Sequence, residues 1–153
     1  MDNLYIEPVT EKNWRVARDL SVAKNQTDFI ESNAQSLLEA AYDKEFEWHP
    51  YILLVGAAPV GFAMIGAHSE ERRSSWLDRF MIAEEYQGQR LGPKFLEYLK
   101  DFIFENWDVD QINLSFEPGN HHARKMYEKH GFEDTGHVDE VFNEIIYRYK
   151  DES

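Results

Sequence analysis

The sequence predicts an α/β protein in which a central mixed sheet of about six to seven strands is covered by about four helices. Three observations lead to this prediction. Short apolar or alternating runs, typical of strands, are interspersed with segments whose apolar residues recur at helical spacing. The second half has the order strand, helix, strand, helix, which requires a parallel strand pair. The length of 153 residues is that of one domain, so we expect residues 1–153 to form a single domain.

The N-terminal half is expected to hold a strand, two helices and an antiparallel hairpin. Thr10 can cap the first helix, and Ser32 with Gln35 matches a capping box, S-x-x-Q, at the start of the second. Two apolar runs joined by the turn GAAP then form the hairpin. The expected elements are a strand at 4–7, helices at 10–20 and 32–43, and strands at 51–55 and 60–66.

In the C-terminal half, a period of two divides the strand expected at 75–82 between two faces. One face would carry Trp76, Asp78, Phe80 and Ile82, and the other Leu77, Arg79 and Met81. Pro93 is expected at the first position of a long helix, where proline is favoured. The remaining expected elements are a strand at 112–116, a helix from Asn120 to Gly131, and final strands from 132 onward and at 143–149.

The composition excludes several classes of function. Asp and Glu number 29 against 16 Lys and Arg, a net charge of −13, which argues against nucleic acid or an anionic membrane as partner. There is no cysteine, so disulfides, thiolate metal sites and cysteine nucleophiles are excluded. The histidines form no H-x-x-x-H or H-E-x-x-H pair, and we expect no metal. The sequence has no segment that resembles a signal peptide and no apolar run long enough to span a membrane. We therefore expect the chain to be soluble and cytoplasmic.

The most informative segment is YQGQRLGP at 86–93. It lies between an expected strand and a long helix, where backbone N–H groups and the helix dipole can hold an anion. Gly88 and Gly92 allow the backbone to approach such a ligand closely. The alternative is an ordinary loop with turn glycines, because short glycine motifs often occur by chance.

A second motif is NHHARKMYEKHGF at 120–132, which contains the pattern N-x-x-A-x-x-x-Y-x-x-x-G-F. Together with Q-x-x-x-x-G at 87–92 and the order of the elements, it resembles the GNAT superfamily of N-acetyltransferases. The resemblance spans the whole chain. It implies the acyl-CoA N-acyltransferase fold, with a splayed pair of parallel strands, and acetyl-CoA as the acetyl donor.

The resemblance also implies which residues hold acetyl-CoA. Main-chain amides of the turn would hold the pyrophosphate, the strand before the turn would pair with the pantetheine arm, and Asn120 would reach the CoA arm. Tyr127 would lie beside the sulfur. The implied cofactor-binding residues are Phe80, Met81, Ile82, Gln87, Gly88, Gln89, Arg90, Leu91, Gly92, Asn120 and Lys129.

Arg90 departs from the family pattern Q/R-x-x-G-x-G/A, because it stands where the first glycine is expected. We expect a slightly different turn, or an added phosphate contact from the guanidinium. Further cations fall in or beside the two motifs and favour a bound polyanion, although solvated helix charges would give the same pattern. They are Lys94, Arg124, Lys125 and Lys129.

The segment WLDRFMI at 76–82 resembles bacterial spermine/spermidine (diamine) acetyltransferases of the BltD kind, as do residues 25–26, 29–32 and 60–64. This resemblance implies a polyamine substrate. A cluster of acidic residues between positions 28 and 47, with only Lys44 opposing it, also favours a cationic amine as the acceptor. Its members are Asp28, Glu31, Glu39, Asp43, Glu45 and Glu47. A solvated acidic helix face is the alternative.

Carboxylates and aromatic rings are expected to bind the acceptor. Glu31 and Asp78 would meet its charges, and Phe29 and Trp76, together with Trp48, would line a channel for its methylene groups. The aromatic residues could equally belong to the core.

The chemistry requires a proton acceptor, because an alkyl amine with a pKa near ~10.4 arrives protonated. Asp78 lies in an apolar strand, where burial would raise its pKa and make it a better base. It could instead relay through water, pair with Arg79 or anchor the substrate. Tyr127 could donate a proton to the leaving thiolate, unless it is a core tyrosine. A backbone N–H near Met81 would stabilise the charge on the acetyl oxygen.

Three functions remain open at this point. The first is a polyamine N-acetyltransferase, and the second is an acetyltransferase for an aminoglycoside, a peptide N-terminus or a small amine. The third is a non-catalytic acyl-CoA-binding regulatory protein, which Arg90 favours and which the presence of both Asp78 and Tyr127 opposes. The family resemblance further implies a homodimer, with the C-terminal strand as a candidate interface.

Overall fold

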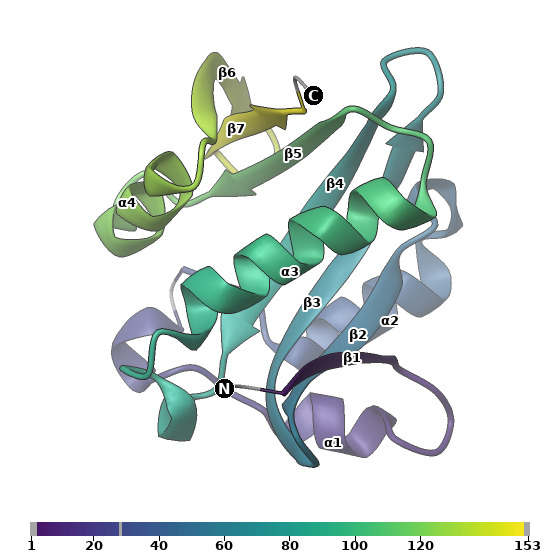
Figure 1. Cartoon of the computed structure of the whole chain (residues 1–153), viewed down its shortest axis with the longest axis vertical. Coiled ribbons are helices and arrows are strands. Elements are labelled where there is room, and N and C mark those ends of the chain that lie inside the picture. The colour runs from purple at the N-terminus through teal and green to yellow at the C-terminus, as the bar shows by residue number, and fades with distance from the viewer. Residues whose placement is uncertain (1–2, 28, 152–153) are drawn as a thin grey trace.

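A seven-stranded mixed sheet in the order β1-β2-β3-β4-β5-β7-β6 forms the centre of the computed structural model, which describes residues 3–27 and 29–151 (Figure 1). The predicted α/β class is confirmed. The strands are β1 (Leu4–Pro8), β2 (His49–Val55), β3 (Ala58–Ser69), β4 (Ser74–Ile82), β5 (Gln111–Phe116), β6 (Glu133–Asp139) and β7 (Glu144–Lys150). The helices are α1 (Trp14–Asp19), α2 (Asn33–Tyr42), α3 (Leu91–Asn106) and α4 (His121–Lys129), with short 3-10 turns η1 (Lys24–Gln26), η2 (Lys44–Phe46) and η3 (Glu84–Tyr86).

Each face of the sheet has its own hydrophobic core. Helix α3 crosses one face, and α1 and α2 cover the other (Figure 1). The apolar stripe predicted for α3 packs into the larger core, where Phe95, Leu96 and Leu99 are fully buried. The smaller core gathers Ala17, Ile52, Phe62, Met64 and Met81 beneath α1 and α2. Both faces are therefore fixed by burial, which sets the register of the strands between them.

The sheet opens in its middle. Strands β4 and β5 are parallel and pair only through Ser74 with Gln111, Ser75 with Ile112, and Trp76 with Asn113. Past Trp76 the two strands diverge (Figure 1), while β4 continues to pair with β3 and β5 with β7. The predicted splayed parallel pair is confirmed, and it separates two antiparallel halves of the sheet.

A bulge in β4 corrects the expected division of its side chains. Arg79 has a left-handed backbone with φ of 54°, and the pairing with β3 shifts between Phe62 and Met64. Leu77, Phe80 and Ile82 consequently pack on the α3 face, while Met81 packs on the opposite face. The expectation that Trp76, Asp78, Phe80 and Ile82 share one face is wrong, because the extra residue of the bulge interrupts the period of two.

Two of the four helix starts predicted from the sequence are confirmed. Ser32 and Asn120 cap α2 and α4, and their side-chain oxygens accept hydrogen bonds from the backbone N–H groups of Gln35 and Ala123. The predicted starts of α1 and α3 are wrong: α1 begins at Trp14 instead of Thr10, and α3 begins at Leu91, which makes Pro93 its third residue. Among the described residues, no helix is long and apolar enough to cross a membrane.

Candidate active site

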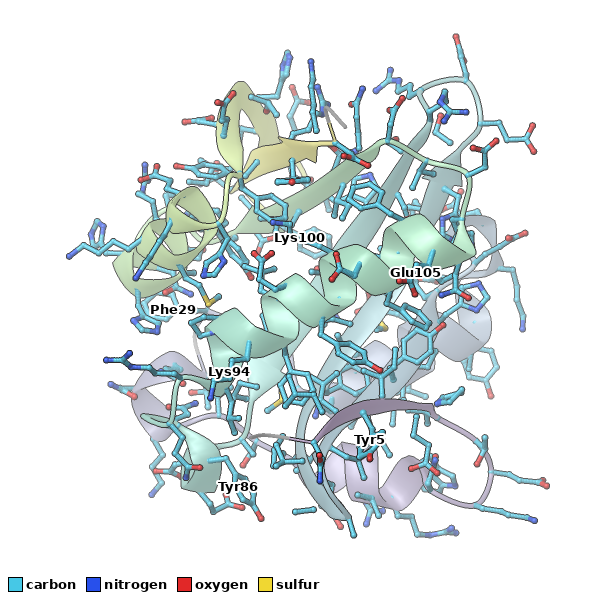
Figure 2. The ribbon with its side chains drawn as sticks, viewed as in Figure 1. Tyr5, Phe29, Tyr86, Lys94, Lys100 and Glu105 are labelled. Atoms are coloured by element: carbon cyan, nitrogen blue, oxygen red, sulfur yellow. The ribbon has the colours of Figure 1, made fainter. Side chains whose placement is uncertain are left out.

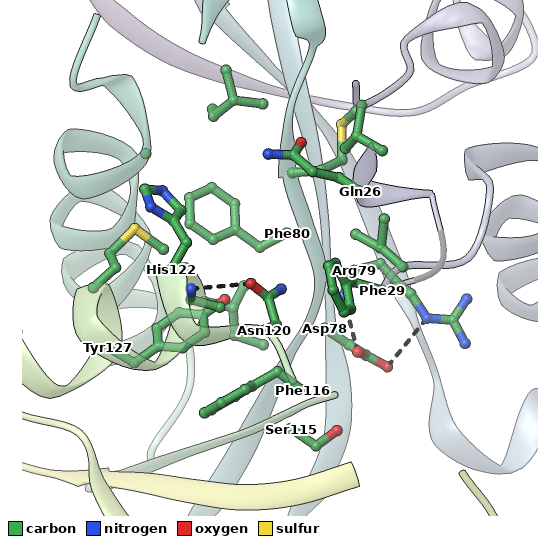
Figure 3. Close-up of a pocket in the computed structure, with 18 of the residues that line it drawn as sticks. Gln26, Phe29, Asp78, Arg79, Phe80, Ser115, Phe116, Asn120, His122 and Tyr127 are labelled. Atoms are coloured by element: carbon green, nitrogen blue, oxygen red, sulfur yellow. Dashed lines mark hydrogen bonds and ion pairs between the residues drawn. The ribbon is translucent and has the colours of Figure 1, made fainter. Parts of the chain in front are cut away.

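The divergence of β4 and β5 opens a cavity of about 850 Å³. Tyr127 and Asn120 reach it from α4 and its cap, and Asp78, Arg79 and Phe80 reach it from β4 (Figure 3). Every site residue predicted from the sequence lines this cavity except Gln89. These residues come together around a cavity because β4 and β5 separate. Phe80 on β4 and Phe116 on β5 would otherwise lie on paired neighbouring strands.

One end of the cavity is the turn between β4 and α3. Gly88 has φ of 83°, and nothing lies within 4 Å of the position a Cβ would occupy there, so the backbone is open to a ligand. The Gln87 amide nitrogen donates to the Ile82 carbonyl and to the Gln26 Oε1, both at 2.8 Å. These bonds tie the turn to the end of β4 and to η1.

Arg90 holds the position of the missing glycine in the conformation that glycine favours. Its φ is 63°, and it is the N-cap residue of α3. The turn is thus formed without the glycine, at the cost of a left-handed non-glycine residue. Arg90, Lys125 and Lys129 line this end of the cavity, whereas the predicted cations Lys94 and Arg124 are not among its lining residues.

Tyr127 lines the cavity and is 8% exposed. Its ring packs against Phe116 and Phe132, with centroids 5.5 and 5.7 Å away, so it belongs both to the core and to the cavity wall. Burial raises the pKa of the Tyr127 phenol, and the negative charges of Asp78 and Glu144 raise it further. The phenol is therefore protonated at neutral pH and able to donate.

Asp78 lies in the same cavity. One carboxylate oxygen accepts a hydrogen bond from the Arg79 backbone N–H at 2.9 Å, and the other lies 3.8 Å from the Arg79 Nε (Figure 3). Burial raises the pKa of the Asp78 carboxyl, and the charge of Arg79 acts in the opposite direction. The pairing with Arg79, one of the alternatives left open by the sequence, is thus present.

The carboxylates that line the cavity do not all come from the acidic segment at 28–47 that the sequence predicted to bind the acceptor. Of the predicted acidic residues, Glu31 and Glu39 line the cavity. Asp43, Glu45 and Glu47 do not line it, and Asp28 lies outside the described residues. Sequence reasoning missed Asp139 and Glu144, which line it from β6 and β7. They face each other across this hairpin, and the Glu144 carboxylate accepts a hydrogen bond from Ser115 Oγ at 2.9 Å.

Aromatic side chains line the same cavity. Phe29, Trp48 and Trp76 line the cavity, as do Phe46 and Phe142, which sequence reasoning missed. Phe29 comes from the segment between η1 and α2 and lies beside the loop that leads into α4 (Figure 2), where a Cβ at Gly119 would be 3.8 Å from its ring. Among the described residues, no group of three or more metal-ligating side chains is close enough to hold an ion.

One cavity lined by cations, carboxylates, a phenol and a buried carboxylate has the groups that a group transferase needs to bind charged substrates and move protons. The chain belongs to the acetyltransferase (GNAT) family, whose model matches residues 16–132. The resemblance on which the sequence analysis relied is confirmed.

The chain is similar in sequence to one curated protein and similar in fold to two solved structures. The spermine/spermidine N(1)-acetyltransferase of Bacillus subtilis (strain 168) is 36% identical over 143 residues, which cover 90% of this chain and 92% of that one. The crystal structure of spermidine N-acetyltransferase from Vibrio cholerae, in complex with CoA and spermine, superposes with a TM-score of 0.73 at 19% identity, covering 95% and 92% of the two chains. Aminoglycoside acetyltransferase AAC(6′)-Ib in complex with coenzyme A gives a TM-score of 0.79 at 19% identity, covering 97% and 95%.

Proposed function

We propose that this chain is an acetyl-CoA-dependent N-acetyltransferase that moves an acetyl group directly to a primary amine of a polyamine of the spermine/spermidine class. The observation that carries the proposal is the division of charge along one cavity. Arg90, Lys125 and Lys129 suit the phosphates of CoA, and carboxylates at the other end suit an acceptor with several ammonium groups. The similarity to the spermine/spermidine acetyltransferase of Bacillus subtilis supports this choice of acceptor.

The donor end fits a CoA pyrophosphate. Open backbone at Gly88 and the N-terminal end of α3 offer N–H donors to an anion. The residues proposed to hold the phosphates are Gln87, Gly88, Arg90, Leu91, Gly92 and Lys129. Beyond the last pair of β4 with β5, the strand edge at Phe80, Met81 and Ile82 is free on the side that faced β5. This edge is proposed to bind the amides of the pantetheine arm, with Asn120 beside it. Gln89 does not line the cavity and is not part of the proposed set.

The acceptor end combines charge with apolar walls. Glu31 and Asp78 are proposed to bind ammonium groups, joined by Glu39, Asp139 and Glu144. The rings of Phe29, Trp48 and Trp76 can cover methylene segments and meet cationic nitrogens face-on. Glu39 and Asp78 already have Arg79 beside them, but a monoamine could meet the charge of only one of Glu31, Asp139 and Glu144, so a polyamine fits better.

Acetyl-CoA supplies the thioester carbonyl on which the amine acts. Asp78 accepts a proton from the ammonium, which leaves the electron pair on nitrogen free to form the amide bond. A backbone N–H near Met81 stabilises the negative charge that develops on the acetyl oxygen. Tyr127 gives its proton to the sulfur and regains one from the nitrogen as the amide forms. Both side chains border the cavity, and burial raises the pKa of each, which makes the Asp78 carboxylate a stronger base and keeps the Tyr127 phenol protonated.

The acceptor class is tested by measuring CoA release with a panel of amines. We expect turnover with spermine and spermidine, less with putrescine, and a KM for spermine that rises with salt because the recognition is electrostatic. Turnover with an aminoglycoside or a peptide N-terminus alone would overturn the polyamine proposal. Binding of acetyl-CoA without turnover on any amine would instead indicate a non-catalytic acyl-CoA-binding protein.

The left-handed Arg90 leads to a separate prediction. Arg90→Gly is expected to increase the free energy of unfolding by about 1 kcal/mol, because glycine adopts φ of 63° without steric cost. It is also expected to weaken acetyl-CoA binding by about tenfold through the loss of a phosphate contact. Thermal melting and titration calorimetry measure the two effects. Gln89→Gly is the matched control and should only destabilise the protein; unchanged acetyl-CoA affinity in Arg90→Gly would exclude the phosphate contact.

We further propose that residues 1–153 form a single acetyltransferase domain that works in the cytoplasm as a homodimer, without a nucleic acid or membrane partner. The net charge of −13 supports the last point, since both of those surfaces are anionic. Light scattering with the purified protein tests the dimer, and a monomer at micromolar concentration would contradict it.

A further inference from the structure

Arg79 is a charged residue that lines the cavity with a nearly buried side chain, 9% exposed. Its two terminal nitrogens bind both oxygens of Glu39, at 3.0 and 3.2 Å, and one of them also donates to Ser36 Oγ at 3.0 Å. Its Nε lies 3.8 Å from the Asp78 carboxylate. A buried charge requires such partners, and these come from α2 on one side and β4 on the other.

The bulge in β4 makes the contact between Arg79 and Asp78 feasible. In a regular strand, consecutive side chains point to opposite faces, so an arginine would turn away from the aspartate before it. The left-handed backbone of Arg79 instead lets its own N–H donate to the Asp78 carboxylate at 2.9 Å while its guanidinium stays on the same side. Such a conformation is uncommon for a residue with a Cβ, and uncommon backbone geometry often occurs at functional sites.

The groups around Asp78 favour its neutral form, with Arg79 opposing them. Burial raises the pKa of the Asp78 carboxyl, and Glu39 on α2 and Asp139 on β6 raise it further. Glu144 on β7 and the Tyr127 phenol on α4 also interact electrostatically with Asp78. The positive charge of Arg79 lowers the same pKa, as does its backbone hydrogen bond.

We propose that Arg79 is a positioning residue for acetyl transfer: it keeps the Asp78 carboxylate ionised and oriented in the cavity, while Glu39 and Ser36 hold the guanidinium in place. This inference rests on the proposed function, because it takes Asp78 as the group that accepts the proton of the ammonium. In that step an N–H bond of the ammonium breaks, the proton passes to a carboxylate oxygen of Asp78, and the electron pair stays on nitrogen. A neutral Asp78 has no site for that proton.

Replacing the arginine is expected to move the pH dependence of the reaction. In Arg79→Gln, the acid limb of kcat/KM for spermine should shift to higher pH by about one to three units, the range by which a nearby opposite charge alters a carboxyl pKa. Arg79→Lys retains the charge and should recover most of this shift. The pKa of the amine is the same for every variant, so it does not affect the comparison.

Glu39, which forms the ion pair with Arg79, provides the decisive comparison. Glu39→Gln breaks the bridge between Arg79 and α2 but removes a negative charge near Asp78, so its acid limb should stay in place or move to lower pH. If the bridge only stabilised the fold, Arg79→Gln and Glu39→Gln would change the enzyme alike. An acid limb that moves to higher pH in Arg79→Gln but not in Glu39→Gln is expected only if Arg79 acts through the ionisation of Asp78.

Arg73 offers a matched control. It is also an arginine with a left-handed backbone, at φ of 51°, and it pairs with Asp108 and Asp110, both at 3.2 Å, away from the cavity. Arg73→Gln should leave the acid limb unchanged. Circular dichroism establishes that each variant is folded, and Arg79→Lys keeps the proposal testable should Arg79→Gln not fold.

A second measurement separates this inference from the proposed function. Carboxyl ¹³C NMR follows the titration of Asp78 in the protein alone, whether or not a polyamine is acetylated. The proposal expects the Asp78 titration to lie at higher pH in Arg79→Gln than in the wild type. An unchanged titration overturns the inference even if spermine is a substrate, and a shifted titration supports it even if the acceptor proves to be another amine. A shifted titration with an unmoved acid limb overturns the assignment of Asp78 as the base.

Discussion

Tyr127→Phe is expected to lower kcat by about 10²–10⁴ while leaving the affinity for acetyl-CoA nearly unchanged. The substitution removes the hydroxyl that would protonate the leaving sulfur. It keeps the ring, whose contacts with Phe116 and Phe132 fill the wall of the cavity. Steady-state CoA release measures the loss of turnover, and calorimetric titration measures the binding of acetyl-CoA. A large fall in kcat with intact binding would assign the hydroxyl to the chemical step.

The control for this variant is Tyr147→Phe. Tyr147 is fully buried in the same part of the core, and its hydroxyl donates to Glu128 at 2.7 Å, but it does not line the cavity. Its removal should leave kcat close to the wild-type value, with any effect confined to stability. Equal losses of turnover in the two variants would mean that the hydroxyl of Tyr127 has no particular role and that packing alone is responsible.

Asp78→Asn is expected to lower kcat/KM for spermine by about 10²–10⁴. The amide has the size of the carboxylate but cannot accept the proton of the ammonium. Its pH profile should lose the acid limb attributed to Asp78, whose pKa is raised by burial. Activity should therefore follow only the ionisation of the amine itself. Initial rates across pH, at saturating acetyl-CoA, provide the measurement.

The surface residue Asp110, which pairs with Arg73, provides the control variant Asp110→Asn. It should retain wild-type kinetics. The division between kcat and KM in Asp78→Asn also distinguishes the roles that the sequence left open. A higher KM for spermine with unchanged kcat would make Asp78 an anchor for the substrate and would rule it out as the base.

Most of the fold could be predicted from the sequence because its signals are local. The apolar stripe of α3, the caps at Ser32 and Asn120, and the alternation in β5 each depend on residues close together in the chain. The splay of β4 from β5 was inferred from family resemblance. Neither periodicity nor propensity indicates that two parallel strands separate after three paired residues.

The site was only partly predictable, and the failures have a common cause. The bulge at Arg79 and its bridge to Glu39 depend on how β3 and α2 pack against β4, which a single strand pattern does not encode. Glu144 was missed because it begins a strand that looks ordinary in isolation. One signal was available: Asp139 and Glu144 flank the turn of the last hairpin, so their like charges were bound to lie opposite each other.

The separation of β4 from β5 has a consequence for the behaviour of the protein in solution. A strand edge with free amide and carbonyl groups on the outside of a molecule can add a strand from a neighbouring molecule and so begin aggregation. Beyond Trp76, β4 has no strand on the side that faced β5, and Phe80, Met81 and Ile82 line the cavity there, with α3 on one side and α4 near it (Figure 1). The chain thus keeps backbone groups available for a small ligand while shielding them from other copies of itself.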